Sequence, residues 1–394
     1  MKLHYRVFVA LGLGILFGWF YPSMATNISF IGDIFTRLLR FLIVPLVFAS
    51  LLTGVVSLKN MSDLGKLGFH SAVYFILSTV IAISFGLLSA FFIQPGLNSV
   101  VEPVTQSTIS QQAPPSIHYI LTSIVPKNLF DAIVQGNMLP IIFSSVFFGI
   151  GLLKINELGR PVIDFFESIN TLMIQLTKWI IEISPIGVFA LIANLTATTG
   201  IATLKPLGLY IITVLFGLCM HAGLFLPIVV YIATRKSCVT LFKSMTSALA
   251  TAFSAASSAA ALPMVLELIV EKAKVPNRVA SFVLPLGTTL NMNGTALYQA
   301  VAVIFIAQFY GIEIGIHHIS LIFLTGVLAA VGAAAIPSAG LFTLGMILTT
   351  TGVPLEGVAL IIAVDRVVDM CRTTVNVWAN SVGAYIIAHT SQQT

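Results

Sequence analysis

The chain has 394 residues, of which 57% are apolar and only 8% are charged, with a formal net charge of +5. Soluble domains carry roughly 25% charged residues, so this composition excludes a soluble globular protein and indicates a membrane protein that crosses the bilayer several times. The basic residues occur in short clusters between apolar stretches, a pattern that disfavours nucleic-acid binding. The three cysteines have no CxxC spacing and predict neither a disulfide framework nor a zinc site.

Six apolar stretches that are long enough to cross a bilayer precede residue 235. They lie at 7–21, 34–58, 69–94, 119–153, 161–197 and 205–234. Clusters of Lys and Arg fall before the first stretch and on alternate connections, so the positive-inside rule places these connections and the N-terminus in the cytoplasm. The first stretch also has features of a secretory signal peptide, with a cleavage site at Ser23-Met24-Ala25. The apolar sequence downstream favours a first transmembrane helix instead.

Two later segments place a run of small residues and a proline between apolar arms that are each too short to span. They are Ser254–Pro263 and Gly332–Gly340. Basic residues flank the first segment on both sides and are absent beside the second, so the two segments are expected to open to opposite sides of the membrane. This pattern predicts two re-entrant helical hairpins that belong to inverted repeats. The alternative is that the small residues only allow close helix packing.

Each of these segments is followed by an apolar stretch that carries polar side chains. In 285–295, an Asn-Gly pair among five hydroxyl or amide side chains predicts a helix that breaks at membrane depth, where freed carbonyls line a cavity or bind an ion. In the last stretch, five polar residues are spaced four, three, four and four positions apart and share one helix face. They are Asp365, Asp369, Arg372, Asn376 and Asn380.

Ionisable side chains at membrane depth cost at least about 2.5 kcal/mol each on translocon scales, so this stripe predicts a functional site. A purely structural ion pair between Asp369 and Arg372 is the alternative, but it does not account for the polar residues that continue the line. Arg372 offers a planar fork for a carboxylate, and Asp369 offers a partner for an ammonium group. The stripe therefore suits an amino acid with a second carboxylate, and serines at the first hairpin tip add donors.

The sequence resembles the dicarboxylate/amino acid:cation symporter family, which includes the excitatory amino acid transporters. The resemblance covers essentially the whole chain and is most specific in 286–299, 369–377, 185–189 and the serine-rich tip. It implies an all-α polytopic membrane protein with eight transmembrane helices and two re-entrant hairpins, which assembles as a homotrimer in the inner (cytoplasmic) membrane. It further implies an elevator mechanism, with a scaffold of residues 1–68 and 119–200 and a transport domain of 69–118 and 201–394.

The resemblance also implies roles for individual residues. Asp369 would hold the amino group of the substrate and Arg372 its side-chain carboxylate, with Asp365 and Arg366 as charge partners. The other substrate-binding residues would be Ser257, Ser258, Thr295, Ile336, Gly340, Thr373 and Asn376, and the second hairpin, 333–340, would be the external gate. The ion-site positions would be Phe75, Ser78, Thr79, Gly287, Thr289, Asn291, Asn293, Asn376 and Asn380. No cofactor is implied beyond a coupling ion.

The sequence departs from the family at two ion-site positions. Members that use sodium carry an Asp where this chain has Asn293, and usually another where it has Asn380. An amide oxygen can coordinate Na⁺ but brings no negative charge, and an uncompensated cation is costly in a low-dielectric site. We therefore expect Na⁺ coupling to be weakened or lost, with transport coupled to a proton, to residual Na⁺ or to no ion. Asp365 and Asp369 are the candidate proton carriers, and His221 is a weaker one.

Three other functions compete with transport of aspartate or glutamate. They are Na⁺-coupled symport of C4-dicarboxylates or neutral amino acids, an anion channel, and a membrane-embedded hydrolase. No GxSxG motif accompanies the serines, which disfavours an enzyme. Because Asp369 and Arg372 are both present, the sequence favours an acidic amino acid, but it does not rank aspartate above glutamate.

Overall fold

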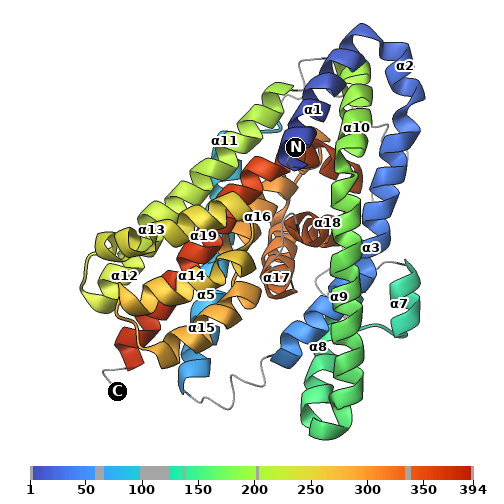
Figure 1. The fold of residues 1–394 in the computed structure, drawn as a ribbon. Helices are drawn as coiled ribbons and strands as arrows, with labels where there is room; N and C mark the ends of the chain where they lie inside the picture. Colours follow the sequence, from blue (N-terminus) through green and yellow to red (C-terminus); the bar gives the residue numbers. More distant parts are fainter. Residues whose placement is uncertain are drawn as a thin grey trace.

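The computed structural model describes residues 3–57, 66–97, 125–135, 138–200, 204–332 and 339–391, and these residues form helices joined by short connections (Figure 1). The α-helices are α1 (Leu3–Phe20), α2 (Pro22–Asn27), α3 (Ser29–Ser57), α5 (Lys66–Ile93), α7 (Leu129–Gln135), α8 (Met138–Lys154), α9 (Arg160–Glu182), α10 (Ser184–Thr199), α11 (Leu204–Met220), α12 (Leu226–Thr234), α13 (Cys238–Ala255), α14 (Ser258–Glu271), α15 (Asn277–Leu290), α16 (Asn293–Phe309), α17 (Ile316–Gly332), α18 (Ala339–Thr351) and α19 (Val358–Ser391). The short helices are η1 (Asn156–Gly159), the π-helical turn η3 (His221–Phe225) and η4 (Leu355–Gly357).

Several of these helices have the length and apolar composition that a bilayer requires. Among the described residues, three helical segments qualify, namely 67–93, 205–234 and 277–309, and a bent pair, 9–20 with 22–35, brings the number to as many as four. Other apolar helices are shorter, such as α8 and α10. The all-α membrane class is thus confirmed. The full set of eight spans stays a prediction. Some predicted stretches are divided in the structure, and 161–197 is shared between α9 and α10, which begins with a proline in its first turn.

The helices pack in two groups (Figure 1). One contains α1, α3, α8, α9 and α10, and the other contains α5, α11 to α16 and α19. In the first group, two glycines let α1 approach α10 closely, since a Cβ at Gly14 would lie 2.9 Å from the carbonyl oxygen of Phe189 and one at Gly18 would meet that of Ala193. The division into a scaffold and a moving domain remains a prediction.

The first predicted hairpin is present as a pair of packed helices. α13 and α14 contact each other, and the turn between them falls in the predicted run of small residues. Ala256 has the left-handed φ of 48°, and the Ser257 hydroxyl caps α14 by accepting a hydrogen bond from the backbone N–H of Ala260. α17 and α18 also contact each other. The predicted tip between them, including Ile336, lies outside the described residues.

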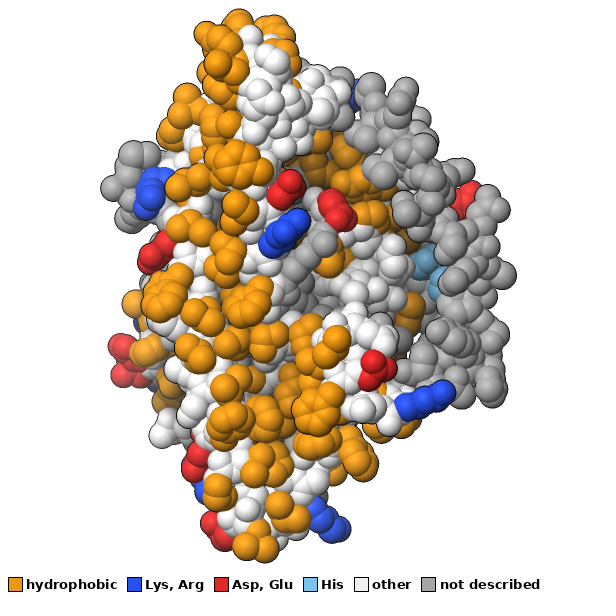
Figure 2. Space-filling view, turned by 90° about the vertical axis from the view of Figure 1, so that its right-hand side faces the viewer, with side chains coloured by type: hydrophobic (Ala, Val, Ile, Leu, Met, Phe, Trp, Pro, Cys, Tyr) orange, Lys and Arg blue, Asp and Glu red, His pale blue; other side chains and the backbone are white. Residues whose placement is uncertain are grey.

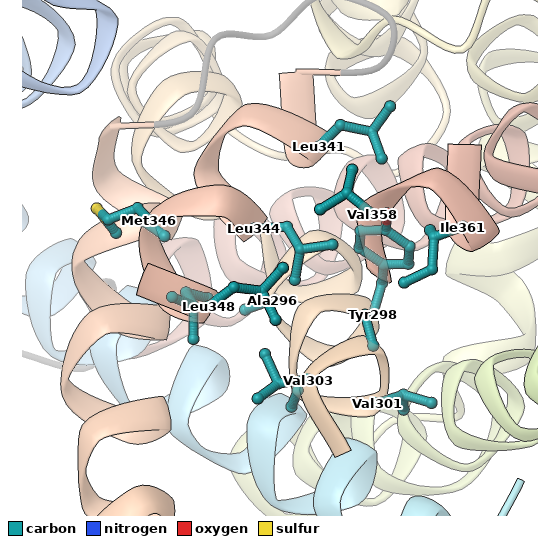
Figure 3. Close-up of a cluster of buried hydrophobic side chains, with 14 of the residues drawn as sticks. Ala296, Tyr298, Val301, Val303, Leu341, Leu344, Met346, Leu348, Val358 and Ile361 are labelled. Carbon is teal, nitrogen blue, oxygen red and sulfur yellow. The ribbon is translucent and has the colours of Figure 1, made fainter. Parts of the chain in front are cut away.

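The predicted helix break lies between α15 and α16. α15 ends at Leu290 and α16 begins at Asn293, while Asn291 and Met292 have non-helical backbone angles. Residues 293–307 are all buried, because α5, α11, α17, α18 and α19 pack around α16. The apolar part of this packing joins α16 to α18 and α19, where Tyr298, Leu344 and Ile361 belong to one cluster (Figure 3). The break is therefore held in the core of the molecule.

Candidate functional site

The polar stripe of α19 is buried as the sequence predicts. Its five residues, Asp365, Asp369, Arg372, Asn376 and Asn380, all lie in the interior. α19 is continuous from Val358 to Ser391, so the spacing of these residues directs them to the same side, toward α16 and its broken N-terminal end. The stripe divides into a charged half, at 365–372, and an amide half, at 376–380.

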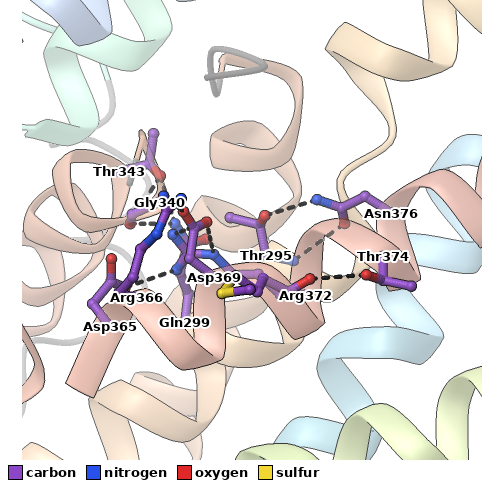
Figure 4. A network of polar contacts seen from close by, with 11 residues as sticks. Thr295, Gln299, Gly340, Thr343, Asp365, Arg366, Asp369, Arg372, Thr374 and Asn376 are labelled. Carbon is purple, nitrogen blue, oxygen red and sulfur yellow. Dashed lines mark hydrogen bonds and ion pairs between the residues drawn. The ribbon is translucent and has the colours of Figure 1, made fainter. Parts of the chain in front are cut away.

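Arg372 is the centre of the charged half (Figure 4). Its Nε and Nη2 lie 2.9 and 2.8 Å from Asp369 Oδ1, and its Nη1 lies 3.2 Å from Asp365 Oδ1. The guanidinium carbon also lies 4.2 Å from the centre of the Tyr298 ring, a cation–π contact. With 1% of its side chain exposed, Arg372 is fixed by two carboxylates and one aromatic face. A buried guanidinium that is held in this way can bind a carboxylate group with defined geometry.

Two glycines leave room for Arg372. A Cβ at Gly294 would meet the backbone carbonyl of Arg372, and a Cβ at Gly340 would lie 2.7 Å from its Nη1. Gly340 is fixed in turn by Gln299 of α16, whose Nε2 donates to the Gly340 carbonyl at 3.1 Å and to the Thr343 hydroxyl (Figure 4). The start of α18 thus lies directly against the guanidinium group.

We expect Gly340→Ala to lower the free energy of unfolding by about 1–3 kcal/mol, because the added methyl group overlaps a guanidinium that its partners prevent from moving. Thermal unfolding of the detergent-solubilised protein measures the change. Gly208→Ala is the matched control, since a Cβ there meets no described atom within 4 Å, and alanine favours a helix over glycine. Equal stability of the two variants would contradict the prediction.

Asn376 connects α19 to the first turn of α16. Its Oδ1 accepts hydrogen bonds from the backbone N–H groups of Gly294 and Thr295 at 2.7 and 3.4 Å, and its Nδ2 donates to the Thr295 hydroxyl at 3.1 Å. The side chain therefore caps the helix that follows the break and satisfies donors that have no intrahelical partner. Thr373, the neighbouring candidate on α19, is buried.

The amide half of the stripe joins a second buried cluster. Asn291 Nδ2 donates to Asn380 Oδ1 at 2.8 Å. The hydroxyls of Ser78 and Thr79 on α5 lie 3.1 and 3.4 Å from Asn291 Oδ1 and 3.5 and 3.0 Å from Asn293 Oδ1, and each hydroxyl can donate its proton to one of these two oxygens. These contacts bring together residues from α5, α16, α19 and the break. We name this group, Ser78, Thr79, Asn291, Asn293 and Asn380, the amide cluster.

The remaining ion-site candidates lie at different distances from the amide cluster. Gly287 lies beside it, since a Cβ there would lie 2.8 Å from Asn380 Oδ1 and 3.3 Å from the ring of Phe75, which is also buried. Thr289 is exposed, and its hydroxyl donates to the carbonyl of Leu286 within its own helix. Ser258, a candidate for substrate binding at the first hairpin tip, is buried at the start of α14.

The structure adds three residues that the sequence did not assign to the site, and it places the weaker candidate His221. Tyr298, Gln299 and Thr343 surround Arg372 and Gly340. His221 is buried in the π-helical turn η3, and its Nε2 lies 3.4 Å from Asn293 Nδ2. From the sequence, a polar side chain inside an apolar span is the one feature that points to His221. π-helical turns frequently occur at functional sites, which is consistent with this position.

A broken helix that buries charged and amide side chains among apolar, membrane-length helices is typical of secondary transporters. The chain belongs to the sodium:dicarboxylate symporter family, whose profile matches residues 3–390. It is thus a multi-pass membrane transporter and not an enzyme, and the resemblance noted from the sequence is confirmed.

Individual relatives match almost the whole chain. It is 37% identical to the proton/sodium-glutamate symport protein of Geobacillus stearothermophilus, with 98% of this chain and 94% of the relative covered. It is 34% identical to the proton/glutamate-aspartate symporter of Escherichia coli (strain K12), over 98% and 92%. It is also 34% identical to human excitatory amino acid transporter 2, over 94% of this chain and 75% of the relative.

Proposed function

We propose that the chain is a secondary transporter of the acidic amino acids aspartate and glutamate. The observation that carries this proposal is the buried Arg372, held by Asp369 and Asp365 beside the broken helix. A guanidinium group and a carboxylate on one helix face complement the side-chain carboxylate and the amino group of such a substrate. The names of the two bacterial relatives, a glutamate symporter and a glutamate-aspartate symporter, support the same substrate class.

The other predicted contacts complete the substrate site in this proposal. Arg372 binds the side-chain carboxylate and Asp369 the amino group. Thr295, Thr373 and Asn376 bind the remaining head group together with Ser257 and Ser258 at the first hairpin tip, while the second hairpin, with Ile336 and Gly340, forms the external gate. The contact between Gly340 and Arg372 supports this arrangement, because it couples the second hairpin directly to the group that receives the substrate.

The proposed mechanism is an elevator, in which the group that contains α5, α11 to α16 and α19, with α17 and α18, slides past a homotrimeric scaffold. Support for the trimer comes from α9, where exposed polar residues follow a helical spacing on a face that lipid alone would solvate poorly. They are Asp164, Ser168, Thr171, Gln175 and Glu182. On the side of the molecule that carries α3, α9 and α10, many of the described side chains are hydrophobic and a few charged ones lie among them (Figure 2). In this proposal the orientation of the protein in the membrane follows the positive-inside rule, with a cytoplasmic N-terminus.

We further infer that Na⁺ coupling is weakened or lost. The amide cluster consists of hydroxyl and amide groups that hydrogen-bond to one another, and His221 adjoins it through Asn293. A cation that entered this cluster would break these bonds without gaining the charge of a carboxylate, at a cost in desolvation that amides do not repay. The coupling ion is then a proton or residual Na⁺, or transport is uncoupled.

Uptake of labelled aspartate and glutamate into proteoliposomes tests the proposal. The measurement is made with Na⁺ and with choline in its place, at two pH values, and with an imposed pH gradient. We expect uptake to persist in choline, and to respond to the pH gradient if a proton is the coupling ion. Steep Na⁺ dependence, with more than one ion per turnover, would contradict the coupling proposal.

The same vesicles separate a carrier from an anion channel. A carrier exchanges substrate, so unlabelled aspartate on one side accelerates the release of labelled aspartate from the other. A channel shows no such stimulation. Transport of succinate or of a neutral amino acid in place of aspartate would contradict the proposed substrate class.

A further inference from the structure

Arg366 on α19 carries a second guanidinium group beside Asp369. Its Nη1 lies 3.8 Å from Asp369 Oδ2, the distance of an ion pair rather than of a hydrogen bond. Its side chain is 19% exposed, against 1% for Arg372. Its Nε is buried and has no hydrogen-bond partner among the described residues. Arg366 is therefore held much more loosely than Arg372.

The two oxygens of Asp369 face different arginines (Figure 4). Oδ1 accepts two short contacts from Arg372, at 2.9 and 2.8 Å, whereas Oδ2 faces Arg366. Breaking the Arg372 contacts would strand a buried charge, while moving Arg366 away costs one long and partly exposed ion pair. Of the two cations on Asp369, Arg366 is thus the one that another cation can replace.

Among the residues that the structure describes, the charges that pair around Asp369 and Arg372 balance one another. Asp365 and Asp369 contribute two negative charges, and Arg366 and Arg372 contribute two positive charges. An ammonium group that approaches Asp369 therefore meets a carboxylate that is already neutralised. It gains full attraction to that carboxylate only when Arg366 moves away, since like charges near one carboxylate repel each other.

We propose that Arg366 competes with the ammonium group of the substrate for Asp369, and so sets how strongly the site prefers amino dicarboxylates to dicarboxylates without an amino group. The inference rests on the proposed function, because it takes Asp369 as the partner of the substrate amino group. When the ligand has an ammonium group, that group replaces Arg366 on Asp369. When the ligand has none, Arg366 stays in place and keeps the carboxylate neutralised.

L-Aspartate and succinate, which differ by one amino group, provide the test. Each is used to displace labelled L-aspartate from the wild type, Arg366→Gln and Arg366→Lys. In Arg366→Gln we expect tighter binding of aspartate and weaker binding of succinate, so that the ratio of the succinate to the aspartate dissociation constant rises about ten-fold or more. In Arg366→Lys, which keeps the positive charge, the ratio is expected to stay within about three-fold of the wild type.

Arg278→Gln is the control, because Arg278 is exposed near the start of α15 and its loss removes the same charge elsewhere. An unchanged ratio in Arg366→Gln, or an equal change in both constants, would overturn the role of Arg366 and leave the proposed function standing. Succinate that fails to displace aspartate from the wild type at any concentration would also overturn it. A wild type that binds neither aspartate nor glutamate would overturn the proposed function and this inference together.

Discussion

Replacement of Arg372 by alanine is expected to lower the affinity for aspartate and glutamate by about 100-fold or more, because the substrate loses a bidentate, charge-assisted partner in a buried site. The same change removes the cation that neutralises Asp365 and Asp369. Breaking a buried ion pair from one side costs about 3–5 kcal/mol, so the free energy of unfolding is expected to fall by this amount. Isothermal binding measurements and thermal unfolding in detergent report the two effects.

Two further variants make this prediction specific. Arg278→Ala removes an arginine that is exposed near the start of α15, away from the site and from α9, so its effect on stability should be under about 1 kcal/mol. Arg372→Lys keeps the charge but loses the fork, so it should recover much of the stability and little of the affinity. Normal aspartate binding by Arg372→Ala would show that the substrate site lies elsewhere.

The sequence predicted those parts of the site that depend on local pattern. The face shared by Asp365, Asp369 and Arg372 follows from helical spacing alone, and the break before Asn293 follows from a cluster of polar and turn-forming residues in an apolar stretch. Both features lie within single elements, where residues a few positions apart must be neighbours.

Contacts between distant elements had no comparable local signal. Thr79 reaches Asn293 across 214 positions, and His221 reaches it across 72. Tyr298 lies under Arg372 because α16 and α19 pack together, and nothing in its own apolar surroundings distinguishes it from a core tyrosine. The family resemblance assigned Thr79 to an ion site, whereas Tyr298 and the Asn293 contact of His221 required the fold.

The amide cluster gives the second large prediction, which concerns the double variant Asn293→Asp with Asn380→Asp. The hydroxyls of Ser78 and Thr79 and the amide of Asn291 already donate to the Oδ1 atoms of these two residues, so a carboxylate can keep these bonds. The double variant also places two negative charges in a buried site. Each charge costs several kcal/mol of stability unless a cation compensates it. We expect the variant to be less stable than the wild type without Na⁺.

Sodium is expected to reverse this loss. A ligand that binds only the folded state adds about 2.7 kcal/mol of stability at a concentration 100 times its dissociation constant. The melting temperature of the double variant should therefore rise with Na⁺ concentration at constant ionic strength, while that of the wild type stays nearly constant. Aspartate uptake by the variant should become dependent on Na⁺ for the same reason, since the charge of the loaded site is balanced only when the ion is bound.

The control for this experiment is Asn277→Asp, which makes the same chemical change at an exposed position at the start of α15. Choline and K⁺ replace Na⁺ in parallel scans. A wild type that is already stabilised by Na⁺ as strongly as the double variant would mean that amides suffice to bind the ion. A double variant without any response to Na⁺ would mean that the cluster lacks the geometry of an ion site, and that charge at these two positions is not what separates sodium coupling from its absence.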